Sequence, residues 1–182
     1  NNGGGVYLFS ATRASGGYPS DGQTFANLES STAIINAYEV ADMISRCNNI
    51  TLQASNDIQV DNAILAGTWG ATHGDLTLVA GRSLIINEHI RTEGGDLTLY
   101  ANETTANGVV DAQRDSGNAV ISLAASKNLA AGSGDVEIIL KEGTGKTNLT
   151  SGDITLAANA SITGSNVMIR NDGPTADSDI DM

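Results

Sequence analysis

The chain has 182 residues, of which 40% are hydrophobic, enough for one domain with a hydrophobic core. It contains 21 glycines, only 2 prolines and 4% aromatic residues, which argues against a helical bundle and against a ligand pocket lined with rings. The 21 acidic residues outnumber the 9 basic ones and give a net charge of −12, so the surface repels phosphate backbones and we expect no nucleic-acid partner.

The N-terminal stretch "GGGVYLFSA", residues 3–11, predicts a strand. Residues 12–32 are rich in Gly and Ser and predict a long loop, and "TAIINA" predicts a return strand, so we expect residues 1–34 to form a first partial coil with a long loop. No apolar run approaches the roughly 18 residues of a membrane-spanning helix. Because the chain begins with Asn1 and not Met, we expect a processed product or a segment of a longer protein.

One helix is predicted near residues 37–47. Its apolar residues recur at helical spacing: Val40, Met43, Ile44 and Cys47. Asn36 and Glu39 have the spacing of a capping box and predict its start. We expect this helix to cover one flank or end of the following repeats, and we expect the lone Cys47 to be a small buried thiol.

A short strand phrase then recurs along the chain. The copies are "NNITLQA" (48–54), "GDLTLVA" (74–80), "GDLTLYA" (95–101), "AVISLAA" (119–125), "GDVEIIL" (134–140), "GDITLAA" (152–158) and "SNVMIR" (165–170). Each alternates apolar and polar residues with the period of a strand, and weaker strands such as "NDIQV" lie between most copies. The spacing is loose, as expected where loops vary and strands do not.

These repeats predict an all-β fold of stacked parallel strands over residues 35–170. If every copy returned to the same position, six or seven coils would stack at about 4.8 Å each into a rod core about 30 Å long. The inward residues would form aliphatic columns: Leu76, Leu78, Leu97, Leu99, Ile121, Leu123, Ile154 and Leu156. Residues 171–182 lack this periodicity and predict an acidic tail or linker.

The segment "INAYEVADMISRCNNITLQASNDIQVDNAI", with the later "GDLTLVAGRSLIINEHIRTEGGDLTLYAN", resembles the filamentous-haemagglutinin-like exoproteins of the two-partner secretion type. Those repeats run as a short helix, a strand pair like "NVTLQASNDI" and a "GDLTLxAGxxI" phrase, an order that residues 49–58 and 74–86 follow. The resemblance covers residues 35–170 and implies a right-handed parallel β-helix from the shaft of a large bacterial surface protein that is exported across the outer membrane.

The resemblance implies a secreted, extracellular protein with a structural or adhesive role and without enzymatic activity or a cofactor. Its partners would be glycans or proteins of a host or neighbouring cell, contacted through loops such as residues 12–32 and 102–118. Two alternatives remain open. Exposed strand edges at the coil ends would let copies join end to end into an extracellular fibre, and other parallel β-helices bind or cleave polysaccharides.

The acidic residue of the repeated phrase is the main candidate for chemistry. Asp75, Asp96, Asp135 and Asp153 each follow Gly and precede a strand. They predict a turn in which Gly has a positive φ and Asp accepts hydrogen bonds from backbone N–H groups, and a ladder of Ca²⁺ ligands is the weaker alternative. Two carboxylates about 5 Å apart in water repel by only about 0.8 kcal/mol, so such a turn requires no metal.

Three other features predict no site. "GTGKT", residues 143–147, lacks the first Gly of a phosphate-binding loop and is followed by a strand pattern instead of a helix. His73 and His89 have no partners at metal-ligand spacing and are expected at exposed corners. Asp111, Arg114 and Asp115 bring charges together in the insertion "ETTANGVVDAQRDSGN", which we expect to be a solvated loop.

Overall fold

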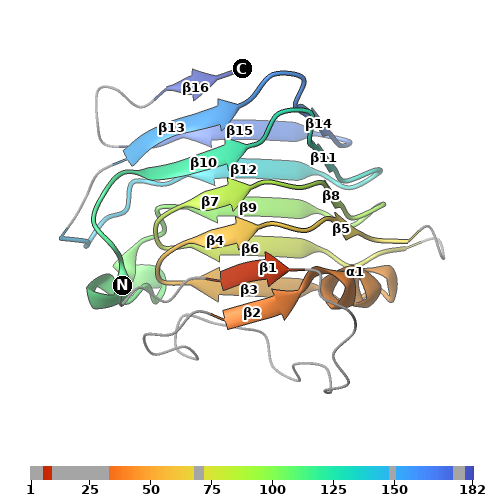
Figure 1. The fold of residues 1–182 in the computed structure, drawn as a ribbon, viewed down its shortest axis with the longest axis horizontal. Helices are drawn as coiled ribbons and strands as arrows, with labels where there is room; N and C mark the ends of the chain where they lie inside the picture. Colours follow the sequence, from red (N-terminus) through yellow and green to blue (C-terminus); the bar gives the residue numbers. More distant parts are fainter. Residues whose placement is uncertain (1–5, 10–32, 68–71, 148–150, 174–178) are drawn as a thin grey trace.

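Parallel strands dominate the computed structural model, which describes residues 6–9, 33–67, 72–147, 151–173 and 179–182 (Figure 1). Sheet A contains, in spatial order, β2 (Ala33–Asn36), β1 (Val6–Phe9), β4 (Ile58–Val60), β7 (Leu84–Ile86), β10 (Ala119–Leu123), β13 (Ser151–Leu156) and β16 (Ile180–Asp181). Sheet B contains β3 (Ile50–Ala54), β6 (Leu76–Ala80), β9 (Leu97–Ala101), β12 (Val136–Leu140) and β15 (Val167–Asn171). Sheet C contains β5 (Ile64–Leu65), β8 (Ile90–Arg91), β11 (Asn128–Ala130) and β14 (Ser161–Thr163).

From β3 onward the chain visits sheets B, A and C in that order, and we call each such passage a round. The described residues complete four rounds, and each strand pairs in parallel with its counterpart in the next round. Figure 1 shows the rounds stacked from the orange N-terminal strands to the blue C-terminal ones. The mostly β fold with stacked parallel strands is therefore confirmed, and the arrangement is consistent with a parallel β-helix.

The repeated phrases do not form one column, contrary to our expectation. Five of them supply the strands of sheet B, in which Leu97 pairs with Leu76 on one side and Val136 on the other. "AVISLAA" and "GDITLAA" supply β10 and β13 of sheet A instead, where Ile121 pairs with Leu84 of β7. The third and fourth rounds each contain two of these phrases, one in sheet B and one in sheet A. The described residues therefore form fewer rounds than the six or seven expected.

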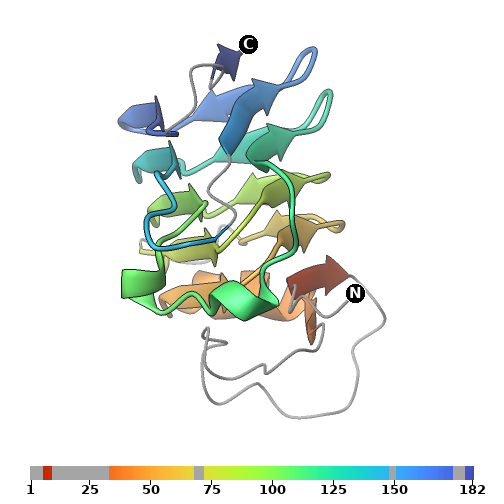
Figure 2. The same cartoon turned by 90° about the vertical axis from the view of Figure 1, so that its left-hand side faces the viewer.

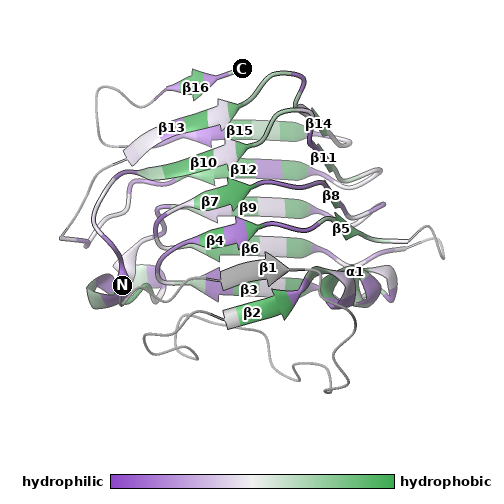
Figure 3. Cartoon of the chain, viewed as in Figure 1, coloured by the Kyte–Doolittle hydropathy of each residue, from purple (hydrophilic) through white to green (hydrophobic). Residues whose placement is uncertain are grey.

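Alternating side chains of the strands fill one continuous core. Leu76, Leu78, Leu97 and Leu99 are fully buried, as their inward assignment predicts. Figure 3 shows hydrophobic residues concentrated on the strands, whereas the connections are largely hydrophilic. Leu156, also expected inward, is only half-buried because it lies close to the C-terminal end of the stack.

The glycine of the Gly-Asp phrase is required for close packing of adjacent rounds. A Cβ atom on Gly95 would lie 1.9 Å from the carbonyl oxygen of Gly74, and one on Gly134 would lie 2.3 Å from that of Gly95. None of these three glycines has a positive φ, so the positive φ that we expected is wrong. The phrase needs Gly because the backbone of the previous round occupies the space of a side chain.

Helix α1 (Ala37–Ser45) covers the N-terminal end of the stack. The Asn36 side chain accepts a hydrogen bond from the Tyr38 backbone N–H at 2.9 Å, which confirms Asn36 as the N-cap of the predicted capping box. The helix buries Val40 and Ile44 and packs against the first strands of the three sheets. Cys47 lies beyond the helix with a φ of 63° and is exposed, so the expected buried thiol is wrong.

The C-terminal end is built differently. β14, β15 and β16 are the last strands of their sheets, and Val167 and Met168 of β15 remain 44% and 42% exposed. No helix covers this end among the residues that the structure describes. Part of the segment expected to be a tail continues the fold, because Ile180 of β16 pairs in parallel with Ile154 of β13.

Candidate functional site

A ladder of side chains runs along the entrance to sheet B. The Oδ1 atom of Asn49 accepts the backbone N–H of Asp75 at 3.0 Å, and Asp75 accepts that of Asp96 at 2.9 Å. Asp96 accepts the N–H of Asp135 at 2.8 Å, and Asp135 accepts that of Asn166 at 3.0 Å. We call this set the corner ladder. It confirms the expected carboxylate to N–H bonding and shows that each bond joins consecutive rounds.

Asp153 does not belong to the corner ladder. It lies at the entrance to sheet A, where its Oδ1 atom accepts the backbone N–H of Asp179 at 3.0 Å. Asp57 makes the same contact with the N–H of Ser83, also at 3.0 Å. The four predicted Ca²⁺ candidates are therefore divided between two corners of the fold, and the described residues contain no group of three His, Cys, Asp or Glu side chains placed to hold a metal ion.

A substitution at Asp96 tests the ladder. Asp96→Asn keeps the Oδ1 acceptor, as Asn49 does in the first rung, and is expected to change the free energy of unfolding by less than about 0.5 kcal/mol. Asp96→Ala leaves the Asp135 N–H without this acceptor and is expected to cost about 1 kcal/mol or more. Urea denaturation with and without millimolar calcium measures both. Stabilisation by calcium that Asp96→Asn abolishes would contradict the ladder's assignment as a backbone acceptor.

The insertion between β9 and β10 folds back along the stack, and we call residues 102–118 the strap. It contains two 3₁₀ turns, η1 (Thr105–Asn107) and η2 (Asp111–Gln113). Figure 2 shows the strap leaving β9, running down the side of the molecule to the level of the first strands, and climbing back to β10. Several of its residues are buried, so the expected solvated loop is wrong.

The strap is fastened to two earlier rounds at the corner between sheets B and A. The Val110 N–H donates to Ser55 Oγ at 3.1 Å, and the Asp115 carboxylate accepts the Asn56 side-chain amide at 2.8 Å. Val109 is buried against Val79 in a small apolar cluster. The two hydrogen bonds span 55 and 59 residues of sequence, which is why local pattern gave no indication of them.

Two cations, one of them part of the strap, are buried where the strap meets the stack. Lys146 and Arg114 are 7% and 6% exposed, and both donate hydrogen bonds to the carbonyl oxygen of Gly81, Arg114 at 3.2 Å. The Lys146 amine also donates to Asn102 Oδ1 at 3.0 Å. Burial and then the positive charge of Arg114 lower the pKa of Lys146 to about 7. A large share of the amine is therefore uncharged at neutral pH.

A carboxylate accompanies these cations. Glu103 is 3% exposed, and its Oε2 atom lies 3.4 Å from the Lys141 amine. That amine also stands over the Tyr100 ring, 3.8 Å from its centroid, and the Tyr100 hydroxyl donates to Glu137 at 2.6 Å. Burial and the Glu137 hydrogen bond raise the pKa of Tyr100 to about 12.

Sequence reasoning missed Asn102, Glu103 and Lys146. Aligning "GDLTLYANE" with "GDVEIILKE" gives the signal that could have found them, because both phrases are followed by an interruption at the same corner. The structure brings those two interruptions together there, and Thr147 donates from its hydroxyl to Asp111 of the strap at 2.7 Å. "GTGKT" is thus part of this corner, and a strand, β13, follows it within the described residues.

The two histidines lie at other corners. The Nε2 atom of His73 is 2.7 Å from the Gly67 carbonyl oxygen, and His89 Nδ1 accepts the Asn128 backbone N–H at 3.1 Å. Both side chains are half-buried and hydrogen-bonded, so they are less exposed than we expected.

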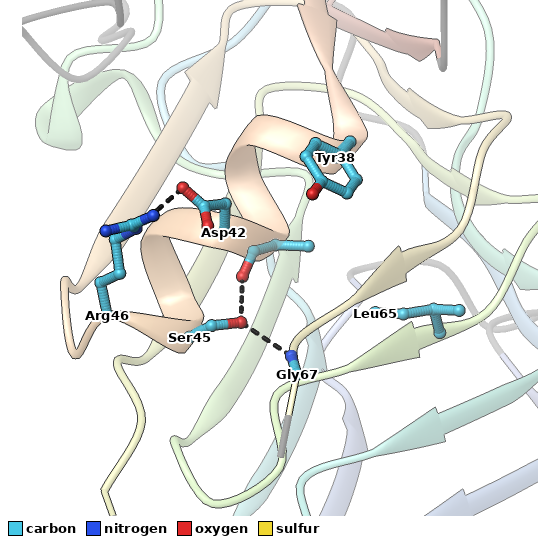
Figure 4. A pocket seen from close by; sticks show the side chains of 7 residues that line it. Tyr38, Asp42, Ser45, Arg46, Leu65 and Gly67 are labelled. Atoms are coloured by element: carbon cyan, nitrogen blue, oxygen red, sulfur yellow. Dashed lines mark hydrogen bonds and ion pairs between the residues drawn. The ribbon is translucent and has the colours of Figure 1, made fainter. Parts of the chain in front are cut away.

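A groove of about 570 Å³ lies between α1 and the end of β5 (Figure 4). Its polar groups bond to one another: Ser45 Oγ donates to the Ala41 carbonyl at 2.6 Å and accepts the Gly67 N–H at 2.7 Å. Tyr38 and Leu65 at its rim are 66% and 47% exposed, which leaves an apolar contact surface on this end of the molecule.

In the part of the chain that is described, no helix has the length and apolar character needed to cross a membrane. Comparison of the chain with protein-family models, with curated proteins and with solved structures gave no match.

Proposed function

We propose that the chain is a right-handed parallel β-helix segment of a secreted bacterial surface exoprotein of the filamentous-haemagglutinin-like type. In this proposal the stacked rounds form a stiff shaft that presents surface insertions to glycans or proteins of another cell. The main support for this proposal is the strap. The rounds on either side of this long insertion keep their parallel register, with β10 paired to β7 and β12 to β9. A rigid scaffold that tolerates a long insertion is suited to presenting it.

The outer surface of the strap is the proposed contact region. Asn107 and Gly108 are exposed, and Val110 is 39% exposed, whereas the inner residues hold the strap to the stack. The other loop expected to make contacts, residues 12–32, lies outside the described residues.

Binding of the labelled chain to cultured epithelial cells and to immobilised glycans tests the adhesive role. The double substitution Ala106→Arg and Val110→Arg is expected to lower binding at least tenfold, because it changes only exposed apolar side chains of the strap. Thr155→Arg, on an exposed position of β13, is the matched control and is expected to bind like the unmodified chain. Equal binding by both variants, at equal melting temperature, would refute a role for the strap in contact.

Self-association is the second candidate function, and the difference between the two ends of the stack favours a dimer. α1 covers the N-terminal end, whereas the C-terminal end exposes Val167, Met168 and the edges of the last strands. This asymmetry supports pairing of two C-terminal ends, which closes as a dimer, over an open filament. Analytical ultracentrifugation should detect a dimer that Val167→Lys abolishes. A monomer at all concentrations would eliminate this candidate.

The polysaccharide-cleaving alternative receives less support. Of the charges grouped in the insertion, Arg114 is buried and bonded to the Gly81 carbonyl, and Asp115 is bonded to Asn56. Within the described residues these side chains hold the strap in place, and Arg114 is bonded to a backbone carbonyl instead of being presented as the base that a lyase would need.

A further inference from the structure

The contact between Lys146 and Asn102 places an amine beside an amide carbonyl group. Lys146 Nζ lies 3.0 Å from Asn102 Oδ1, and because a carbonyl bond is about 1.23 Å long, the amide carbon Cγ lies no more than about 4.2 Å from the amine. Asn102 is fully buried and Lys146 is 7% exposed, so water has little access to either group. Burial holds the amine close to a carbonyl carbon that it could attack.

The Asn102 amide is held in one orientation. Its Nδ2 group donates to the Lys141 carbonyl at 2.8 Å while Oδ1 accepts the Lys146 amine. Gly143 packs directly against it: a Cβ atom on that residue would lie 2.5 Å from Asn102 Oδ1. The amide therefore cannot turn away, and its carbonyl stays directed at Lys146.

Burial favours the uncharged form of the Lys146 amine, which is the form that nucleophilic attack requires. An ammonium ion has no lone pair, so a lysine reacts with a carbonyl only when it is uncharged. Burial and the nearby Arg114 charge lower the pKa of Lys146 to about 7, against the opposing influence of Glu103 and Asp111. At neutral pH a nucleophilic amine thus lies beside a fixed amide.

We propose that Lys146 and Asn102 form an intramolecular isopeptide bond that joins the strap to the loop between β12 and β13. The Nζ lone pair attacks Asn102 Cγ, the new C–N bond forms, the Cγ–Nδ2 bond breaks and ammonia leaves. One proton passes from Nζ to the departing nitrogen, so no oxidant, reductant or other reactant is needed. The product is a neutral secondary amide that joins two residues 44 positions apart in the sequence.

Glu103 is the positioning residue for this reaction. It follows Asn102 directly, is 3% exposed, and is fixed by hydrogen bonds to its Oε1 atom from the Thr104 N–H at 2.8 Å and the Asn107 amide at 2.9 Å. Attack makes Nζ positive, and the negative Glu103 side chain, which already acts on the Lys146 charge, favours that intermediate.

Intact-mass spectrometry of the purified chain tests the bond. We expect a mass lower than that of the sequence by one ammonia molecule, and a proteolytic fragment in which the peptides containing residues 102 and 146 are joined. Lys146→Met and Asn102→Ala are expected to have their full sequence masses. A folded unmodified chain with its full sequence mass would overturn the proposal, whether or not the variants fold.

The Lys146→Met variant also distinguishes formation of the isopeptide bond from a side reaction of Asn102. Cyclisation of Asn102 onto its own backbone would release ammonia too, so loss of ammonia that persists in Lys146→Met would overturn the proposal. Glu103→Gln is expected to leave a measurable unreacted fraction at an unchanged melting temperature, and Glu103→Asp to restore the reaction. Complete reaction in Glu103→Gln would overturn the role assigned to Glu103.

Discussion

Replacing Gly95 by Ala is expected to lower the free energy of unfolding by about 3 kcal/mol or more. The added Cβ atom would lie 1.9 Å from the Gly74 carbonyl oxygen, a backbone atom that can move only if the two rounds separate. Separation would lengthen the ladder contact between Asp75 and Asp96 as well. The cost therefore exceeds that of a side-chain clash in a core that can repack.

The chain contains its own control for this prediction. Gly152 stands in a nearly identical phrase, "GDITL", but a Cβ atom there would meet the Val120 side chain at 3.0 Å instead of a carbonyl group. Gly152→Ala is expected to change stability by less than about 1 kcal/mol, because a side chain can move aside. Urea denaturation of both variants measures the difference. Equal losses would mean that glycine has the same function in sheets A and B.

The substitution Leu99→Ala is expected to cost about 3 kcal/mol, within the range of large-to-small changes in a packed core. Leu99 is fully buried and lies between Leu78 and Ile138 of the neighbouring rounds, so the cavity cannot close without disturbing both. The adjacent Thr98 faces outward and is half-exposed. Thr98→Ala should cost less than about 1 kcal/mol in the same denaturation experiment. A small loss of stability in Leu99→Ala would contradict this prediction, because it would mean that the neighbouring rounds close the cavity.

Alternation of apolar and polar residues was sufficient to predict parallel strands and an inward row of leucines. It could not assign a phrase to a sheet, because "GDLTL" and "GDITL" have the same period and the same turn residues. Only pairing across rounds separates them: Leu97 aligns with Leu76 in sheet B, whereas Ile154 aligns with Ile121 in sheet A. Register between distant segments is a property of the packed chain and not of a local window.

The helix and the corner ladder were the most predictable features, since an N-cap or an Asp before a strand depends on neighbouring residues. Cys47 was mispredicted because its helical spacing continued past the point where the helix ends at Ser45. The strap was mispredicted for a different reason. Polar composition indicates a solvated loop, but Asn102 and Arg114 become buried when the strap meets Gly81 and the loop at Lys146.

The strap also affects how the molecule would respond to mechanical load. A pull along the stacking axis would separate a plain stack one round at a time, because each round is bonded only to the next. The strap connects β9 to residues near Ser55 and Gly81 and to the loop that contains Lys146, so several rounds would share the tension. Residues that interrupt the repeat would thus raise the force that the whole stack withstands.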